Sequence, residues 1–579
     1  MPVAIIQLMP FNLAKELRKH WPVTVVLALF VASIFFVGFH GDFAVNDDWI
    51  FVRQVEAFVT GLGWELNAQI DPSFVGQGLA GFVWAKIFGS GFVSLRILTL
   101  AFSVVLLFTS YKILHLLKID EKLSFVALAL ITFNPLIFTS SFSFMSEIYF
   151  LVYFAAGVYF YLKYLKADDK AQNMADVLLG SVFVGLAILV RQVGITTYIA
   201  FLLAAVFYKK LGWKTFVTSF LPVGIAVWVF SVWPRYLTTE LSGSLAGLLS
   251  NLIEAEDILA RLGDLLWSLP YFALFLMPSL LTFNKVKFTK KSLVVGAIFL
   301  AFASLISYHL YLADIFRLGN VFYVEGLFVK SNFRSNFHIF NNIPFKMLLA
   351  FLISLALVRF ATFFKFAKKL DPTSLFLLLT TLGSFAILTF GNDLYDRYLL
   401  PSFLSLVFFV LYYFKGLIRF EAKWQWASLI LVVALAIFHQ HEYLSHTRLR
   451  WEFANRVHME TGYLNSIAVG GTYAKYFSAV EDEDYIGLEG GEPAVGFVCF
   501  VEDYTIDTTG ILFRFGEWFD QLSKRAVENP DVFDARRTTS LSSAKKNLDK
   551  LLYNQEYFSP EFNLIGKRAF VAAWCDDIE

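Results

Sequence analysis

Long apolar segments alternate with short polar ones over most of the chain. The first runs from Trp21 to His40 without an acidic residue, Lys or Arg, and about 20 apolar residues suffice to cross a bilayer as a helix. Windows of about 19 residues predict roughly thirteen spans, near 22–40, 92–114, 123–141, 146–165, 173–190, 194–208, 215–233, 263–283, 292–312, 344–364, 373–391, 397–414 and 424–440. Arg191 and Gln192 interrupt the stretch 173–208, which leaves two short helices or one long broken helix.

Clusters of basic residues indicate how these spans are oriented. They are Lys15, Arg18 and Lys19; Lys163, Lys166 and Lys170; Lys209, Lys210 and Lys214; Lys285, Lys287, Lys290 and Lys291; Lys365, Lys368 and Lys369; and Lys415, Arg419 and Lys423. An odd number of spans places all of them on one side, which the positive-inside rule makes cytoplasmic. We therefore expect a cytoplasmic N-terminus and an extracytoplasmic C-terminus. The first span is expected to remain as an anchor, since it is too long for a signal peptide and lacks a small-residue cleavage site.

The chain changes character near residue 441. Acidic residues, Gly and alternating apolar runs such as PAVGFVCFVEDYTI replace the long apolar segments. We expect a transmembrane domain over 1–440 and a small extracytoplasmic α/β domain over 441–579, because about 140 residues can bury a core. Cys499 and Cys575 both lie in this second domain. They could form a disulfide outside the cytoplasm or remain two unpaired core residues.

Composition agrees with a membrane protein. Hydrophobic residues make up 57% of the chain and charged residues 16%, whereas soluble domains are about 25% charged. The net charge of +1 gives no indication of a nucleic-acid partner. The predicted fold class is therefore an all-α polytopic membrane protein with a small C-terminal domain.

The first outer loop opens with two adjacent acids. In NDDWIFVRQVEAFVTGLG, residues 46–63, apolar positions recur at helical spacing and glycines follow. GQGLAGFVWAKIFGSG, residues 76–91, is too short to cross the membrane. Both are predicted to be helices lying along the interface. Asn46 or Asp47 could cap the first helix, but acids at a membrane boundary more often face a ligand.

Five stretches, in order, resemble motifs of GT-C glycosyltransferases, which include the aminoarabinose transferases of lipid A and the protein mannosyltransferases. Asp-Asp-Trp-Ile-Phe at 47–51 resembles the Asp-Glu-x-x-Tyr motif of their first outer loop. The others are SLRILTL (94–100), FNPLIFTSSFSFMSEIYFLVYFAAGVYFYLKYL (133–165), GLAILVRQVG (185–194) and DRYLLPSFLSLVFF (396–409). The resemblance covers most of residues 20–440 and implies a GT-C fold of about thirteen transmembrane helices.

The resemblance implies transfer of a sugar from a polyprenyl-phosphate donor to a lipid, glycan or protein acceptor, at the outer face of a plasma or inner membrane. Asp47 matches the first acid of the motif and is the predicted base. Asp48 stands where the family has Glu, and Glu147 is a further candidate acid. Guanidinium groups suit a phosphate, so Arg191 and Arg397 are the predicted donor-phosphate ligands.

Two further groups of residues are candidates for binding the donor and for binding a metal ion. Arg317, Arg334 and His338 lie among Phe and Tyr in the outer loop 313–343, which suits a phosphate and a prenyl chain. These motifs establish no cofactor, and Asp47, Asp48 and Glu147 could hold a divalent ion through oxygen. HQHEYLSH (439–446) offers ligands for a transition metal or a polar belt at the interface.

Two other functions fit a polytopic membrane protein. An O-antigen polymerase or ligase also uses polyprenyl-linked sugars, but its activity would centre on a large loop late in the chain. A transporter would show inverted repeats and acids near the bilayer midplane. The singled-out acids lie instead at span boundaries, which favours the transferase.

Overall fold

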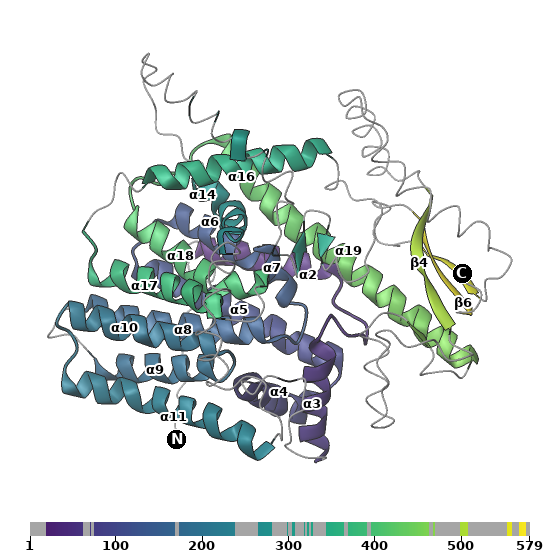
Figure 1. Ribbon diagram of the computed structural model, residues 1–579, viewed down its shortest axis with the longest axis horizontal. Coiled ribbons are helices and arrows are strands. Elements are labelled where there is room, and N and C mark those ends of the chain that lie inside the picture. Colours follow the sequence, from purple (N-terminus) through teal and green to yellow (C-terminus); the bar gives the residue numbers. More distant parts are fainter. Residues whose placement is uncertain are drawn as a thin grey trace, which may run out of the picture.

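A computed structural model gives the arrangement of the helical part of the chain (Figure 1). It describes residues 19–61, 70, 74–167, 173–237, 265–280, 298, 301, 304–306, 308, 318, 321–323, 326–327, 343–363, 369–390, 395–461, 467–468, 498–507, 553–557 and 567–574. Most of these residues form α-helices gathered in one body. The predominance of helix that the apolar pattern predicts is confirmed.

The N-terminal part of the body contains the first apolar helix and the helices of the first outer loop. Its helices are α2 (Trp21–Val37), α3 (Asp48–Thr60), α4 (Val75–Phe88) and α5 (Phe92–Leu116). Pro22 lies in the first turn of α2, where its missing N–H costs nothing. Gly61 ends α3 in a left-handed conformation with φ 78°, which glycine adopts without strain. The two short helices predicted in this loop are therefore present.

The middle of the chain forms a stack of helices. In order they are α6 (Glu121–Thr132), α7 (Pro135–Ser140), α8 (Ser146–Lys166), α9 (Met174–Ile188), the 3-10 turn η3 (Gln192–Gly194), α10 (Ile195–Phe207) and α11 (Trp213–Leu237). Figure 1 shows α8, α9, α10 and α11 running side by side, and α9 packs between α8 and α11. The stretch 173–208 thus forms two short helices, the first of the two forms considered from the sequence.

The later helices complete the body. They are α14 (Leu269–Leu280), α16 (Ile343–Phe363), α17 (Pro372–Ala386), the 3-10 turns η6 (Ile387–Phe390) and η7 (Asp396–Leu399), α18 (Leu400–Tyr413) and α19 (Lys423–Thr461). Asp371 and Ser374 form a capping box at the start of α17, which satisfies otherwise unpaired backbone N–H groups. Helix α17 packs against α10 and α18, and α19 against α7, α2 and α14.

Short strands occur at two places. β1 (Phe322–Tyr323) and β2 (Gly326–Leu327) form an antiparallel pair. After α19, four strands form a mixed sheet in the order β3-β4-β6-β5, namely β3 (Ile467–Ala468), β4 (Val498–Asp507), β5 (Tyr553–Tyr557) and β6 (Lys567–Trp574). Helix α19 crosses residue 440 without a break. The α/β domain and its boundary stay predictions, and Cys575 lies outside the described residues.

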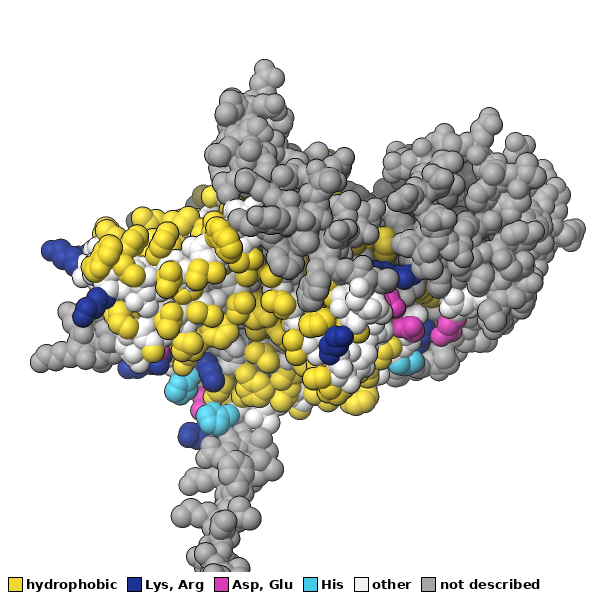
Figure 2. All heavy atoms as spheres, turned by 90° about the horizontal axis from the view of Figure 1, so that it is seen from below, with side chains coloured by type: hydrophobic (Ala, Val, Ile, Leu, Met, Phe, Trp, Pro, Cys, Tyr) yellow, Lys and Arg dark blue, Asp and Glu magenta, His cyan; other side chains and the backbone are white. Residues whose placement is uncertain are grey.

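The outer surface of the helical body is strongly apolar. Phe35, Phe207 and Trp213 are 75%, 70% and 77% exposed. In Figure 2 apolar side chains cover most of the described body, and Lys and Arg lie mainly near its margins. An apolar surface of this extent is rare in soluble monomers and fits contact with lipid tails.

Five described helices are long and apolar enough to cross a membrane: Phe92–Leu116, Ser146–Lys166, Trp213–Ser231, Pro344–Ala361 and Lys423–Ser445. Shorter apolar helices include Trp21–Val37, Met174–Ile188 and Pro372–Ala386. These helices support a multi-pass membrane protein. The number of spans and the orientation of the termini stay predictions.

Candidate functional site

A buried arginine holds the segment that leads from α2 to the two acids. Arg96, near the start of α5, is 1% exposed. Its Nη1 donates to the carbonyl oxygens of Phe39 (2.6 Å) and Gly41 (3.3 Å), and its Nη2 to that of Phe43 (2.9 Å). The guanidinium also lies over the Phe43 ring, 4.6 Å from its centroid. One side chain of α5 therefore fixes the backbone just before Asp47 and Asp48.

Asp48 is buried and bound to backbone groups from two parts of the chain. It is 2% exposed. Its Oδ1 accepts from Val45 N at 2.7 Å and its Oδ2 from Phe144 N at 3.4 Å. Burial raises the pKa of Asp48 to about 8, although Arg96 and these backbone N–H groups favour the charged form. This carboxyl group ties the first outer loop to the segment before α8.

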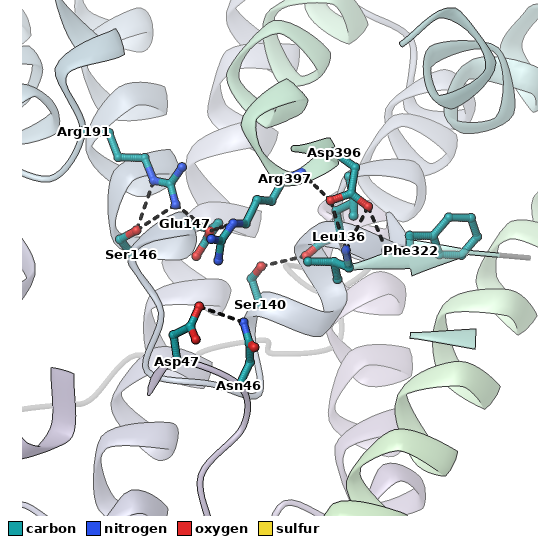
Figure 3. A network of polar contacts seen from close by, with 11 residues as sticks. Asn46, Asp47, Leu136, Ser140, Ser146, Glu147, Arg191, Phe322, Asp396 and Arg397 are labelled. Atoms are coloured by element: carbon teal, nitrogen blue, oxygen red, sulfur yellow. Dashed lines mark hydrogen bonds and ion pairs between the residues drawn. The ribbon is translucent and has the colours of Figure 1, made fainter. Parts of the chain in front are cut away.

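Asp47 has a different environment. It is exposed and stands at the N-cap position of α3, where, within the described part of the chain, its side chain makes no capping hydrogen bond. Its Oδ2 accepts from Asn46 Nδ2 at 3.2 Å. Asp47 also interacts electrostatically with Arg397, and Figure 3 shows it beside the group that contains this arginine. The carboxylate is thus accessible and close to a cation.

Glu147 opens helix α8 and pairs with an arginine from the break between α9 and α10. The Glu147 side chain is 2% exposed, and its Oε1 lies 2.5 Å from Arg191 Nη2. Ser146 Oγ accepts from both Nε and Nη2 of Arg191, at 3.0 and 2.9 Å. A Cβ on Gly194 would lie 3.0 Å from Ile188 N, so a larger residue there would force the backbone at the break to shift by a few tenths of an ångström. Arg191 is therefore directed at the start of α8.

Arg397 approaches the same carboxylate from the start of α18. Its Nε lies 3.8 Å from Glu147 Oε1, and its side chain is 14% exposed. Arg191 and Arg397 both lie over the ring of Tyr398, at 5.1 and 5.6 Å from its centroid. Figure 3 shows Glu147 between the two guanidinium groups, with Asp47 nearby. A carboxylate and two arginines from three separate elements thus converge.

Asp396 anchors the turn that carries Arg397. Its carboxylate accepts from Val321 N (3.2 Å), from Phe322 N (2.8 Å) and from Arg397 N (2.7 Å). Asp396 is fully buried. These bonds join η7 to the start of β1 and fix the backbone from which Arg397 extends.

The structure brings together four of the predicted site residues, Asp47, Glu147, Arg191 and Arg397, whereas Asp48 is buried and bound to the backbone of Val45 and Phe144. Arg317, Arg334 and His338 lie outside the described residues. Sequence reasoning missed the roles of Arg96 and Asp396. Charged residues at the ends of apolar helices are costly unless paired, and that signal could have drawn attention to both.

A metal centre finds no support in the described residues. No group of three or more His, Cys, Asp or Glu side chains described by the structure is arranged to hold a metal ion. In HQHEYLSH, His441 Nδ1 lies 3.0 Å from the carbonyl oxygen of Phe36. The side chain of His446 lies outside the described residues.

These features define a multi-pass membrane protein in which a buried carboxylate and two guanidinium groups meet at helix ends. Residues 80–236 match the family model described as dolichyl-phosphate-mannose-protein mannosyltransferase. This segment includes Glu147 and Arg191. Over this segment the match confirms the resemblance to GT-C glycosyltransferases found in the sequence.

Other comparisons add little. The apo crystal structure of the Archaeoglobus fulgidus oligosaccharyltransferase is similar at 12% identity and a TM-score of 0.34. The alignment covers 87% of this chain and 64% of that chain, so this protein spans less than two thirds of the length of that relative. None of the curated proteins matches the chain.

Proposed function

We propose that the protein transfers a hexose or pentose from a polyprenyl-phosphate donor to a lipid, glycan or protein acceptor on the outer face of the membrane. The observation that supports this most directly is the position of Asp47, an exposed carboxylate next to Arg397. Sugar transfer needs a carboxylate for the acceptor and cations for the departing phosphate. The arrangement offers both within one group of side chains.

In the proposed reaction, Asp47 accepts the proton of the acceptor hydroxyl group. The acceptor oxygen forms a bond to the anomeric carbon, which is oxocarbenium-like in the transition state. The bond from that carbon to the phosphate oxygen breaks, and its electron pair stays on the phosphate. Arg191 and Arg397 stabilise this charge, since guanidinium presents donors in a fork that fits phosphate oxygens.

The environments of the other two acids favour supporting roles. Asp48 is buried, is bound to the N–H groups of Val45 and Phe144, and has a pKa near 8. It is therefore largely protonated at neutral pH and suited to fixing the loop. The carboxylate of Glu147 forms ion pairs with Arg191 and Arg397, so it is less available to accept a proton. Asp47 remains as the accessible base of the three candidates.

The outer loop 313–343, with Arg317 and Arg334, is proposed to border the donor. Leu318 and Val321, within this loop, are buried, and the backbone N–H of Val321 bonds to the carboxylate of Asp396, the neighbour of Arg397. The described part of the loop thus contacts the turn that carries Arg397. This contact supports a role for the loop at the same site.

Transfer of radiolabelled sugar tests the proposal. The purified protein is incubated with polyprenyl phosphates carrying different labelled sugars and with membrane lipid, glycan and peptide acceptors. Label should leave the polyprenyl phosphate and appear on one acceptor class. A protein that moves the intact donor across vesicles, with no change in its covalent structure, would instead be a transporter.

A further inference from the structure

Glu147 is the only one of the three candidate acids that contacts both predicted phosphate ligands. Its Oε1 lies 2.5 Å from Arg191 Nη2 and 3.8 Å from Arg397 Nε. Its Oε2 is buried and, within the part of the chain that the structure describes, has no hydrogen-bond partner. A carboxylate that served only to join two arginines would gain from using both oxygens, because an unpaired buried polar atom is costly. The geometry therefore points to a role for the charge itself.

Arg191 is also held without Glu147. Ser146 Oγ accepts from its Nε and Nη2, and Tyr398 lies under its guanidinium group. Arg397 is fixed through its backbone by Asp396. The positions of both arginines thus have support besides the ion pair. What Glu147 supplies uniquely is one negative charge between them.

The negative charge of Glu147 changes how strongly the arginine pair binds a phosphate group. Two guanidinium groups and one carboxylate leave a net charge of one positive unit. The donor is a phosphodiester with one negative charge. The departing phosphate becomes a phosphomonoester, which carries almost two negative charges at neutral pH because its second pKa is about 6. Asp47 and Asp396 also act on Arg397. Loss of the Glu147 charge would therefore strengthen binding of the doubly charged product more than binding of the singly charged donor.

We propose that Glu147 is a positioning residue that lowers the positive charge of the Arg191–Arg397 pair, so that the pair holds the doubly charged phosphomonoester less tightly than it would without Glu147. The inference rests on the proposed function, since it takes the arginine pair to be the donor-phosphate site. During transfer, the electron pair of the broken bond adds negative charge to the phosphate beside Glu147. Repulsion between these like charges promotes departure of the polyprenyl phosphate.

Binding of two probes tests this inference on the full chain. Farnesyl phosphate stands for the product and farnesyl methyl phosphate for the donor diester. At pH 8 the ratio of monoester affinity to diester affinity is measured for the wild-type protein and for Glu147→Gln. In Glu147→Gln this ratio should rise by about tenfold, since one unit charge at a few ångströms changes binding by about that factor. Glu147→Asp keeps the charge and should keep the wild-type ratio.

Glu56→Gln, which removes an exposed carboxylate from α3, is the matched control and should change nothing. An equal loss of affinity for both probes in Glu147→Gln would show a merely structural role and overturn the inference. If the wild-type protein binds neither probe, the proposed donor site itself fails. The two failures are therefore distinguishable.

The pH dependence of binding gives a second readout. The monoester carries about one charge at pH 5 and about two at pH 8, because its second pKa is about 6. The affinity for the monoester relative to the diester should rise less over this range in the wild-type protein and in Glu147→Asp than in Glu147→Gln. The diester corrects for titration of the protein, including that of Asp48. An equal rise in all three proteins would contradict the role of Glu147.

Discussion

Asp47 and Asp48 are neighbours in the chain but lie in opposite environments. Asp48 is 2% exposed and accepts hydrogen bonds from the backbone N–H groups of Val45 and Phe144. Asp47 is exposed and interacts with Arg397. One carboxyl group thus joins two segments of the chain, and the other is accessible to solvent.

The burial of Asp48 predicts how stability depends on pH. Its pKa of about 8 in the folded protein exceeds the value of about 3.9 expected in an unfolded chain. The folded state therefore holds a proton that the unfolded state has lost between these pH values. The contribution of Asp48 is fully present below about pH 4 and falls by up to about 1.4 kcal/mol per pH unit until about pH 8.

Asp48→Asn should remove this dependence while Asn Oδ1 still accepts from Val45 N. Melting temperatures of both proteins in detergent between pH 5 and pH 8 provide the measurement. The variant should melt at a higher temperature relative to wild type at pH 8 than at pH 5. Asp47→Asn serves as the matched control because Asp47 is exposed. A parallel pH profile for wild type and Asp48→Asn would show that Asp48 is not buried as described.

Removal of the Arg96 side chain should loosen the whole first outer loop. Arg96→Gln leaves the carbonyl groups of Phe39, Gly41 and Phe43 without their shared donor. Leaving a buried acceptor without its hydrogen bond costs about 1–3 kcal/mol. Thermal unfolding should show a lower melting temperature, and sugar transfer should slow because Asp47 is no longer fixed.

Arg419→Gln, at an exposed position, is the control for Arg96→Gln. It should leave both melting temperature and transfer unchanged. Wild-type stability in Arg96→Gln would show that its three carbonyl contacts do not hold the loop.

Arg397 should contribute directly to donor affinity. Arg397→Gln should weaken binding of farnesyl methyl phosphate by about tenfold or more, since a hydrogen bond to a charged group contributes about 1.5–3 kcal/mol. Arg397→Lys keeps the charge but loses the fork-shaped set of donors, so its affinity should be intermediate. Calorimetry on the purified proteins measures both. Arg53→Gln, on α3, should bind like wild type; equal affinity in Arg397→Gln would remove this arginine from the site.

The loop 313–343 gives a separate prediction. The double variant Arg317→Ala and Arg334→Ala should raise the donor KM and leave the melting temperature close to that of wild type. Its proposed role is to hold the phosphate and the prenyl chain, whereas Asp47 acts on the acceptor. Steady-state transfer rates at several donor concentrations measure the effect. An unchanged KM would exclude these two arginines from donor binding.

The sequence predicted the parts of this site better than their connections. Apolar periodicity located α3 and α8, and the resemblance to GT-C enzymes singled out Asp47, Glu147, Arg191 and Arg397. The ion pair of Glu147 with Arg191 spans 44 residues, and such a contact depends on how helices pack. The same reason hid the contact of Arg96 with Phe39, 57 residues away. Local patterns define helices and polar positions, but packing alone decides which polar side chains meet.

The same limit applies to Asp47 and Asp48. Their order in the motif suggested a shared chemistry, since both are carboxylates at the edge of a span. Their difference arises from Phe144, whose backbone N–H reaches Asp48 across 96 residues. A helix pattern could place α3 but could not tell which of the two carboxyl groups would be buried against the segment before α8.

The most direct test of the account is sugar transfer by Asp47→Asn. Asn keeps the size of the side chain and most of its capacity to cap a helix, but it cannot accept the acceptor proton. Loss of a positioned acid or base lowers rates by about 10²–10⁴-fold. We expect a loss of this size with an unchanged melting temperature and unchanged binding of farnesyl methyl phosphate, while Glu56→Gln transfers sugar normally. Transfer by a folded Asp47→Asn protein at close to the wild-type rate would contradict the assignment of Asp47 as the base.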